Sequence, residues 1–198
     1  MNFLFRVRIL FSYRDIVLFI RNINKSAYTP KLVIIQGYEK IQYPISTSKI
    51  SFPVLLLKGE ELVKNKIDYL ELYIKSTYYK EYLTKNIWVK IPGTENLDSI
   101  IMLTSHYDHL GMCGNAIFPG ASDNASGTSV NLDLVKYYST NPEKYTMVFV
   151  FCSAEEIGLY GSTFAAQNPL VNLDNVRFLL NLDMCGTGSN GVHIVNAT

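Results

Sequence analysis

Three apolar runs in the sequence lead directly into side chains that can bind a metal ion or transfer a proton. IIMLTS is followed by His106 and Asp108, MVFVFCSA by Glu155 and Glu156, and FLLNL by Asp183. Burying so many ionisable groups beside apolar strands is costly unless the charges are paired or coordinate a cation. One imidazole with several carboxylates suits a divalent ion, and zinc accepts mixed nitrogen and oxygen ligands best.

The loop PGASDNASG adds one more carboxylate, Asp123, just ahead of a predicted helix. Each motif alone has an ordinary structural role. His106 and Asp108 can form a hydrogen-bonded pair, two glutamates favour a helix start, and an aspartate in a small-residue loop caps a turn. Asp183 alone could be a surface residue at a strand end. The prediction of a metal site depends on their conjunction, because all of them fall at one predicted edge of a sheet.

The elements that must position these side chains alternate between strand and helix after residue 80. Apolar runs at 87–91, 100–104, 147–152 and 178–182 predict strands, and helical spacing predicts helices over 126–139 and 155–167. A further strand is expected at 192–195. This alternation predicts an α/β three-layer sandwich with a mostly parallel central sheet. In such sheets ligands gather at the carboxyl ends of the strands, where the candidate residues lie.

The first 80 residues have a different composition, rich in Lys, Tyr, Ile and Asn and without histidine. They predict a small β-rich segment, with strands at 3–11, 16–20, 32–35, 53–57 and 69–75 and a short helix at 60–64. We therefore expect two parts, 1–80 and 81–198.

Composition excludes several classes of protein. With 18 Lys+Arg against 17 Asp+Glu, the chain lacks the basic surplus of a nucleic-acid binder. A hydrophobic content of 48% argues against intrinsic disorder. No apolar run is long enough for a membrane span, and the start of the chain makes a poor signal peptide. Three dispersed cysteines imply no disulfide framework.

Taken in order, SHYDHLG, PGASDNASGT, SAEEIGLYGS and NLDMCG resemble the co-catalytic zinc aminopeptidases of the bacterial leucyl aminopeptidase, aminopeptidase Y and glutamate carboxypeptidase type. The resemblance covers residues 83–198. It implies the phosphorylase/hydrolase-like sandwich fold and removal of N-terminal residues from peptide substrates. The segment ISFPVLLLKGEEL, with the strands before it, is similar to the second half of a protease-associated domain.

The resemblance also implies a role for each site residue. His106 and Asp183 would bind one zinc, Glu156 the other, and Asp123 would bridge the two. Glu155 falls at the general-base position, taking a proton from a metal-bound water. Asp108 would orient the His106 ring, and a cis peptide bond is expected after Asp123. Zinc is thus the expected cofactor, with two ions in the complete family site.

One departure from the family pattern concerns a fifth ligand, a histidine well downstream of Asp183. Only His193 follows, inside a VHIV strand pattern, and we expect it not to be a ligand. His109 is expected to lie behind the ligands or to face solvent. These features predict a chain truncated at both ends, C-terminally incomplete in its catalytic domain. Such a chain should bind close to one zinc and have little or no activity.

Two alternatives stay open on the sequence alone. One is a glutaminyl-cyclase-like zinc transferase of similar fold. The other is a catalytically dead peptidase fold that only binds peptides or partners. The protease-associated segment favours a peptidase. No nucleic-acid or membrane partner is indicated, and the resemblance suggests a secreted, periplasmic or membrane-anchored setting that the chain itself does not reveal.

Overall fold

A computed structural model of the chain describes residues 32–38, 51–58, 79–113, 115–186, 191 and 194–195. The chain divides into two compact units, Met1–Lys80 and Glu81–Thr198. In the first unit, β1 (Val33–Tyr38) pairs in parallel with β2 (Val54–Lys58). These two strands fall on predicted ones. The other elements expected before residue 80 lie outside the described residues, and the likeness to a protease-associated domain stays a prediction.

The second unit contains a four-stranded sheet in the order β3–β7–β4–β8. Strand β4 (Asn96–His106) lies between β7 (Tyr145–Cys152) and β8 (Val176–Asn181) and is parallel to both. Strand β3 (Ile87–Ile91) is antiparallel to β7 at one edge. The predicted α/β class with a mostly parallel central sheet is therefore confirmed.

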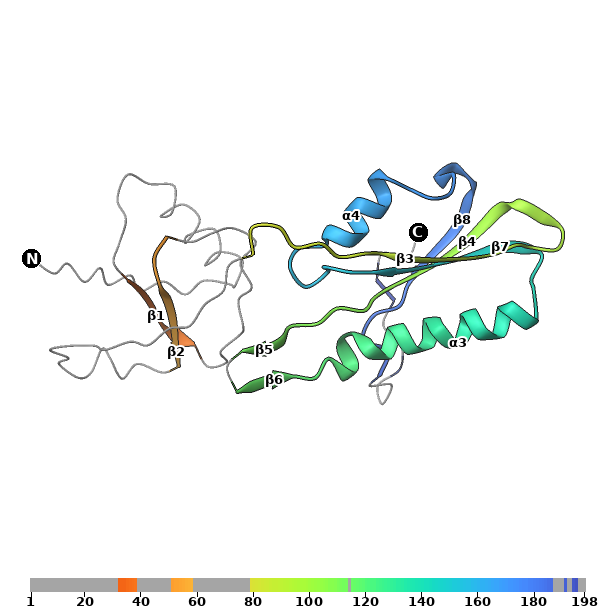
Figure 1. The fold of residues 1–198 in the computed structure, drawn as a ribbon. Coiled ribbons are helices and arrows are strands. Elements are labelled where there is room, and N and C mark those ends of the chain that lie inside the picture. Colours follow the sequence, from red (N-terminus) through yellow and green to blue (C-terminus); the bar gives the residue numbers. More distant parts are fainter. Residues whose placement is uncertain are drawn as a thin grey trace, which may run out of the picture. The chain divides into compact units, whose positions relative to one another are not determined.

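Helices α3 (Gly127–Thr140) and α4 (Tyr160–Gln167) cover opposite faces of this sheet (Figure 1). Side chains of a strand alternate between its two faces, so the central strands supply a core to each helix. The core toward α3 is built from Leu103, Met147, Phe149 and Phe151. The core toward α4 is built from Ile100, Met102, Val148, Val150 and Cys152. The three layers place β4 and β7 at the centre of the unit.

The second helix begins later than its spacing predicted. Residues 155–159 form a turn, in which the Glu155 carbonyl accepts from the backbone N–H groups of Gly158 and Leu159, both at 2.9 Å. Leu159 has a φ of 60°, a left-handed conformation that cannot continue a right-handed helix. The helix starts only at Tyr160, so the two glutamates lie in a turn that follows β7.

Shorter elements between β4 and α3 were not predicted. A hairpin of β5 (Gly111–Cys113) and β6 (Ala116–Phe118) leads into the irregular helix η1 (Ala121–Ser126). A 3₁₀ turn, η2 (Leu173–Asn175), precedes β8. Elements this short carry too little periodicity to be seen in a sequence. Of the strand expected at 192–195, only residues 194–195 are described, and they are exposed and outside any strand.

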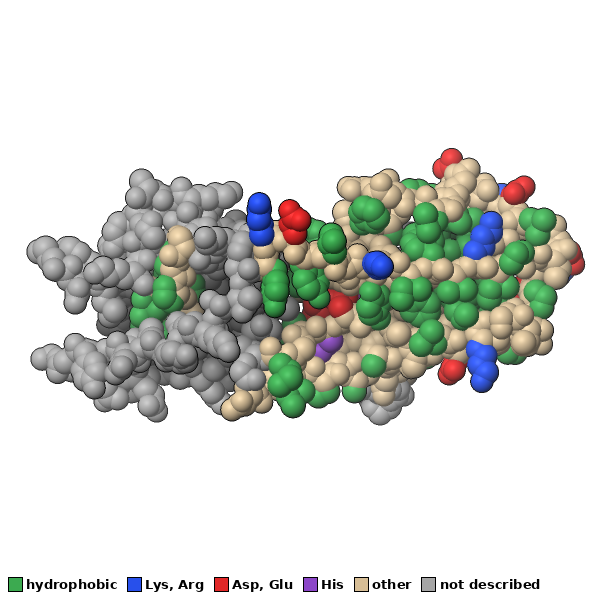
Figure 2. All heavy atoms as spheres, in the orientation of Figure 1, with side chains coloured by type: hydrophobic (Ala, Val, Ile, Leu, Met, Phe, Trp, Pro, Cys, Tyr) green, Lys and Arg blue, Asp and Glu red, His purple; other side chains and the backbone are tan. Residues whose placement is uncertain are grey.

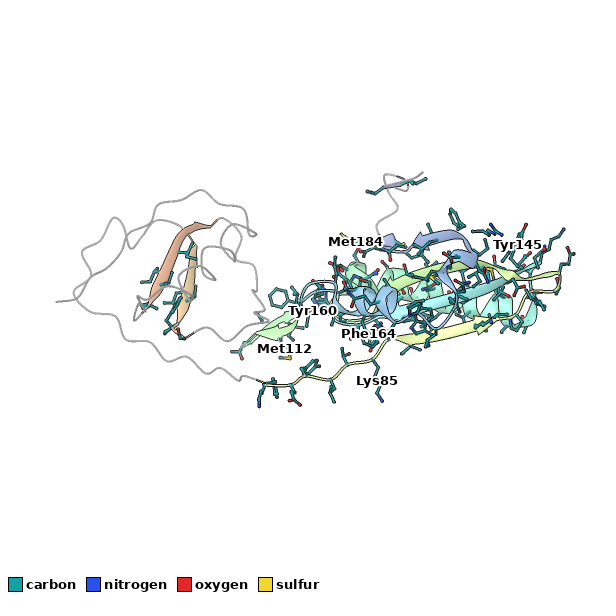
Figure 3. The ribbon with its side chains drawn as sticks, turned by 90° about the horizontal axis from the view of Figure 1, so that it is seen from above. Lys85, Met112, Tyr145, Tyr160, Phe164 and Met184 are labelled. Carbon is teal, nitrogen blue, oxygen red and sulfur yellow. The ribbon has the colours of Figure 1, made fainter. Side chains whose placement is uncertain are left out.

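Strand direction fixes where a site can form. Figure 3 shows Tyr145, where β7 begins, at one end of the sheet, and Tyr160, where α4 begins, near the other. The parallel strands β4, β7 and β8 all end at the side of Tyr160. Within the described residues, no helix is both long and apolar enough to cross a membrane.

Candidate metal centre

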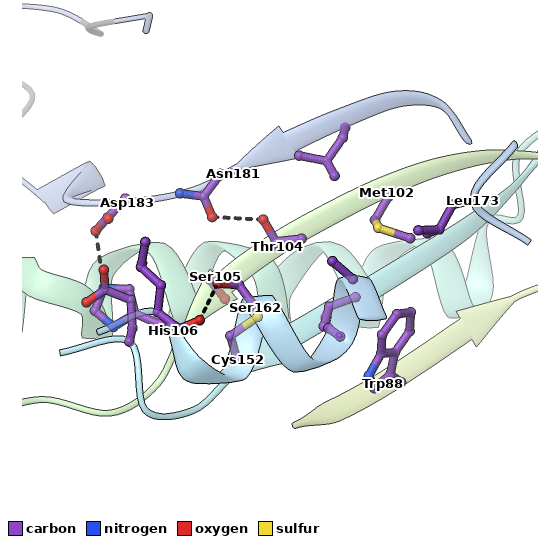
Figure 4. Close-up of a pocket in the computed structure, with 16 residues that line it drawn as sticks. Trp88, Met102, Thr104, Ser105, His106, Cys152, Ser162, Leu173, Asn181 and Asp183 are labelled. Atoms are coloured by element: carbon purple, nitrogen blue, oxygen red, sulfur yellow. Dashed lines mark hydrogen bonds and ion pairs between the residues drawn. The ribbon is translucent and has the colours of Figure 1, made fainter. Parts of the chain in front are cut away.

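Parallel pairing brings His106 and Asp183 together. His106 ends β4, while Asp183 follows the end of β8, and the Leu182 N–H donates to the Thr104 carbonyl at 2.8 Å. The Thr104 hydroxyl also donates to the Asn181 side chain at 2.8 Å (Figure 4). This register leaves Asp183 Oδ1 3.5 Å from His106 Nε2. The histidine is buried, whereas the aspartate is exposed.

Asp123 reaches the same imidazole from the loop before α3. Its Oδ1 lies 3.2 Å from His106 Nε2, and the peptide between Asp123 and Asn124 is cis. His106, Asp123 and Asp183 each offer a ligand atom within 4.8 Å of the others. Three of the predicted site residues therefore converge in one cluster at the carboxyl edge of the sheet.

The buried side chain of Asn124 fastens the Asp123 loop to the end of β8. Its amide N–H donates to the Leu182 carbonyl at 3.0 Å. Its Oδ1 accepts from the N–H groups of Gly127, at 3.0 Å, and Met184, at 3.3 Å. Asn124 thus fixes the distance between Asp123 and the segment that carries Asp183.

Replacing Asn124 with alanine should destabilise the fold and loosen the metal cluster. The change leaves the buried Gly127 N–H and the partly buried Leu182 carbonyl and Met184 N–H without partners, and a buried group left this way costs about 1–3 kcal/mol. We expect urea unfolding to show that the free energy of unfolding of Asn124→Ala is lower by at least this amount. Asn168→Ala is a matched control, because Asn168 is exposed at the end of α4 and its side chain donates to the Phe164 carbonyl. Equal stability of the two variants would contradict the fastening role of Asn124.

Asp108 holds the turn that carries the two glutamates. Its carboxylate oxygens accept the backbone N–H groups of Glu155, at 3.1 Å, and Glu156, at 3.2 Å. Its contact with His106 differs from the one expected. His106 Nδ1 lies 3.2 Å from the Asp108 carbonyl oxygen, while the nearest carboxylate oxygen is 3.8 Å away. The main chain of Asp108 therefore lies closest to the ring, and its side chain positions the glutamates.

A second cluster contains Glu156 and a residue that sequence reasoning set aside. His109, Asp123 and Glu156 offer ligand atoms within 4.8 Å of one another, so Asp123 belongs to both clusters. His109 Nδ1 lies 2.6 Å from Glu156 Oε1, and the histidine side chain is only 22% exposed. The sequence did contain a signal for His109, because it is a second histidine, three residues after His106, in the same motif of candidate metal ligands.

Glu155 belongs to neither cluster but lies beside the first. Its Oε2 is 3.9 Å from His106 Nε2. Burial raises the pKa of Glu155; His106 opposes this effect, and the neighbouring carboxylates of Glu156, Asp183 and Asp108 add to it. The residue also lines a cavity of about 360 Å³ between α4 and the sheet. Figure 4 shows His106 and Asp183 at one end of this cavity and Trp88, Met102 and Leu173 toward the other.

The donor atoms fit zinc. His109 Nδ1 and Glu156 Oε1 are buried and have no hydrogen-bond partner in the described part of the chain. Buried polar atoms normally have hydrogen-bond partners, so a ring nitrogen and a carboxylate oxygen that lack them and lie beside a shared carboxylate are suited to binding a cation. Figure 2 shows a face on which a histidine side chain, in purple, lies beside acidic ones, in red. Imidazole and carboxylate together are ligands that zinc accepts.

Two imidazole–carboxylate clusters at the carboxyl edge of the sheet in an α/β sandwich are typical of a metal-dependent protein. Residues 86–198 match peptidase family M28. The chain belongs to this family, which confirms the resemblance seen in its motifs.

Curated relatives agree. Aminopeptidase YwaD of Bacillus subtilis is 30% identical over 187 residues, covering 90% of this chain and 39% of that protein. A probable zinc metalloprotease of Pyrenophora tritici-repentis is 36% identical over 113 residues, covering 54% of this chain and 23% of that protein. The chain thus spans well under half the length of either relative.

Solved structures show the same fold. The zinc aminopeptidase BSAP of Bacillus subtilis matches with a TM-score of 0.56 and 26% identity, covering 81% of this chain and 39% of that one.

Two further relatives carry a compartment in their names: a vacuolar membrane protease of Kluyveromyces lactis and endoplasmic reticulum metallopeptidase 1 of Mus musculus.

Proposed function

We propose that this chain is a zinc-dependent exopeptidase that removes N-terminal residues from peptides. The observation that supports this most directly is the pair of clusters sharing Asp123, with Glu155 beside them and outside both. His106, Asp123 and Asp183 would hold one zinc, and Glu156 would serve the other together with Asp123. Zinc, when bound, supplies Lewis acidity that makes water a stronger nucleophile.

Glu155 is the proposed general base. Its carboxylate is close to His106 yet free of the two ligand sets, so it can accept a proton from attacking water and deliver it to the departing amine. Its raised pKa suits this exchange, because a base whose pKa approaches the working pH can both take up and release a proton. Asp108, by accepting the N–H groups of Glu155 and Glu156, keeps the base and the adjacent ligand in fixed relative positions.

The relatives named as aminopeptidases favour this substrate class. The names of the vacuolar and endoplasmic reticulum relatives favour a protein of the secretory or membrane system. Peptides with a free N-terminus are the proposed partners.

The proposal predicts zinc-dependent release of an aminoacyl group from a chromogenic amide. The 198-residue chain is stripped with a chelator, refilled with zinc, and assayed on a leucyl anilide. An N-acetylated copy of the same substrate is the control. We expect the free amine to be hydrolysed, the acetylated copy to be spared, and the chelator to abolish turnover. The sequence led us to expect little or no turnover in this chain, so long incubations are needed. Absence of hydrolysis with zinc bound would favour the alternative of a binding protein, and conversion of an N-terminal glutamine would favour a cyclase.

A further inference from the structure

We propose that His109 is itself a zinc ligand in this chain. With Glu156 and the shared Asp123 it would form the ligand set of a second zinc. This inference rests on the proposed zinc-dependent function but concerns metal content rather than turnover. It replaces the expectation, drawn from sequence alone, that the chain holds close to one zinc because Glu156 lacks an imidazole partner.

His109 and Glu156 are in close contact, and no hydrogen bond joins them in the described part of the chain. Nδ1 and Oε1 are 2.6 Å apart, yet neither atom has a hydrogen-bond partner within the described residues. A histidine that merely supported Glu156 would direct an N–H at the carboxylate. A ring nitrogen without a proton and a carboxylate oxygen are both acceptors, and at this distance they repel unless a cation binds them both. Zinc is such a cation and uses the lone pair of an unprotonated ring nitrogen.

The backbone holds the His109 ring in this place. A Cβ atom at Gly120 would lie only 2.7 Å from His109 Cγ and 2.9 Å from its Cβ, so the ring packs directly on the Gly120 backbone. Gly120 also has a φ of 69°, which favours glycine. On the other side, Asp108 ties the chain next to His109 to the N–H groups of Glu155 and Glu156. Two contacts therefore place His109 beside Glu156: the packing of its ring on the Gly120 backbone, and the hydrogen bonds from Asp108 to the turn that carries Glu156.

The resulting ligand sets are equivalent in chemistry. One contains His106, Asp183 and Asp123, and the other contains His109, Glu156 and Asp123. Three protein ligands with one position left open are typical of catalytic zinc sites. Two ligands of one zinc lie about 3–3.5 Å apart, as follows from bonds of about 2.0–2.2 Å, so His109 and Glu156 part slightly on binding.

Metal stoichiometry in single-histidine variants tests the proposal. The sequence has three histidines, so His106→Ala, His109→Ala and His193→Ala form a complete set. Each variant is titrated with Co²⁺ and, separately, with Zn²⁺, and bound metal is measured by elemental analysis after gel filtration. We expect two ions per chain in the unchanged protein and in His193→Ala, but one in His109→Ala. Circular dichroism checks that each variant is folded.

A second variant makes ligation directly visible and does not depend on metal loss. His109→Cys replaces the ring nitrogen with a thiolate, and the zinc–sulfur bond of about 2.3 Å partly offsets the shorter side chain. We expect Co²⁺ bound to this variant to show a sulfur-to-cobalt charge-transfer band that the unchanged chain lacks. Because Cys113, Cys152 and Cys185 are present in both chains, a band that appears only in His109→Cys shows that residue 109 touches the metal.

The outcomes separate the possible roles. Two ions in His109→Ala with binding weakened about 10–100-fold would mean that His109 only positions Glu156, and the proposal would be wrong. Loss of an ion in His193→Ala instead would assign the ligand to His193 and also overturn it. One ion in the unchanged chain would overturn it as well. A fall from two ions to one in His109→Ala, with no peptide hydrolysis by the unchanged chain, would support the ligand role and reject the proposed function.

Discussion

Glu155→Gln should hydrolyse the leucyl anilide about 10²–10⁴-fold more slowly than the unchanged chain while binding the same amount of zinc. The amide keeps the shape of the side chain and one acceptor oxygen but cannot take up the proton. Because Glu155 lies outside both ligand clusters, its loss removes proton transfer and leaves metal binding intact. Turnover number and elemental analysis on the same preparation measure the two effects together.

Glu143→Gln is the matched control for this change. Glu143 is exposed in the segment between α3 and β7, away from the site, so its amide should leave turnover unchanged. Full turnover in Glu155→Gln would assign the base elsewhere. Loss of zinc in the same variant would instead make Glu155 a ligand.

Asp123→Asn should lose more metal than any other single change, because Asp123 is the one side chain common to both clusters. An amide oxygen is a weaker, uncharged ligand, and removal of a shared carboxylate also takes away negative charge between two cations. Loss of a residue that only supports a ligand lowers metal affinity by up to about 100-fold. For Asp123→Asn we expect the affinity for both ions to fall by more than this. Competition with a chromophoric chelator measures it.

Asp133→Asn controls for the removal of a negative charge, since Asp133 is exposed on α3. It should bind zinc as the unchanged chain does. If Asp123→Asn removed only one of two ions, Asp123 would belong to a single site, and the pairing of the clusters would be wrong.

The sequence predicted the central strands well because they are buried on both faces. Continuous apolar runs such as IIMLT and MVFVFC are typical of strands covered by a layer on each side, and the parallel arrangement follows from their alternation with helices. Predicted strand 87–91 coincides with β3 (Ile87–Ile91). Convergence at one sheet edge was foreseeable for His106 and Asp183, because each lies where a parallel strand ends.

The details around those strands depended on tertiary contacts that leave little trace in local pattern. Residues 155–159 have helical composition, but Asp108 accepts two of their N–H groups and holds them in a turn. The placement of His109 depends on its packing against Gly120, farther along the chain. Neither contact could be deduced from periodicity, and so the role of Asp108 toward the glutamates and the close approach of His109 to Glu156 were missed.

The single carboxylate of Asp108 also has a genetic consequence. Its two oxygens accept the N–H groups of consecutive residues, forty-seven and forty-eight positions along the chain. Glu155, the proposed proton acceptor, and Glu156, the proposed metal ligand, are thus held by the same side chain. A substitution of Asp108 therefore acts on both glutamates together, since a shift of this anchor displaces both of them. Natural variation should therefore retain Asp108, and a lineage that abandons hydrolysis would keep this anchor for as long as it still binds metal.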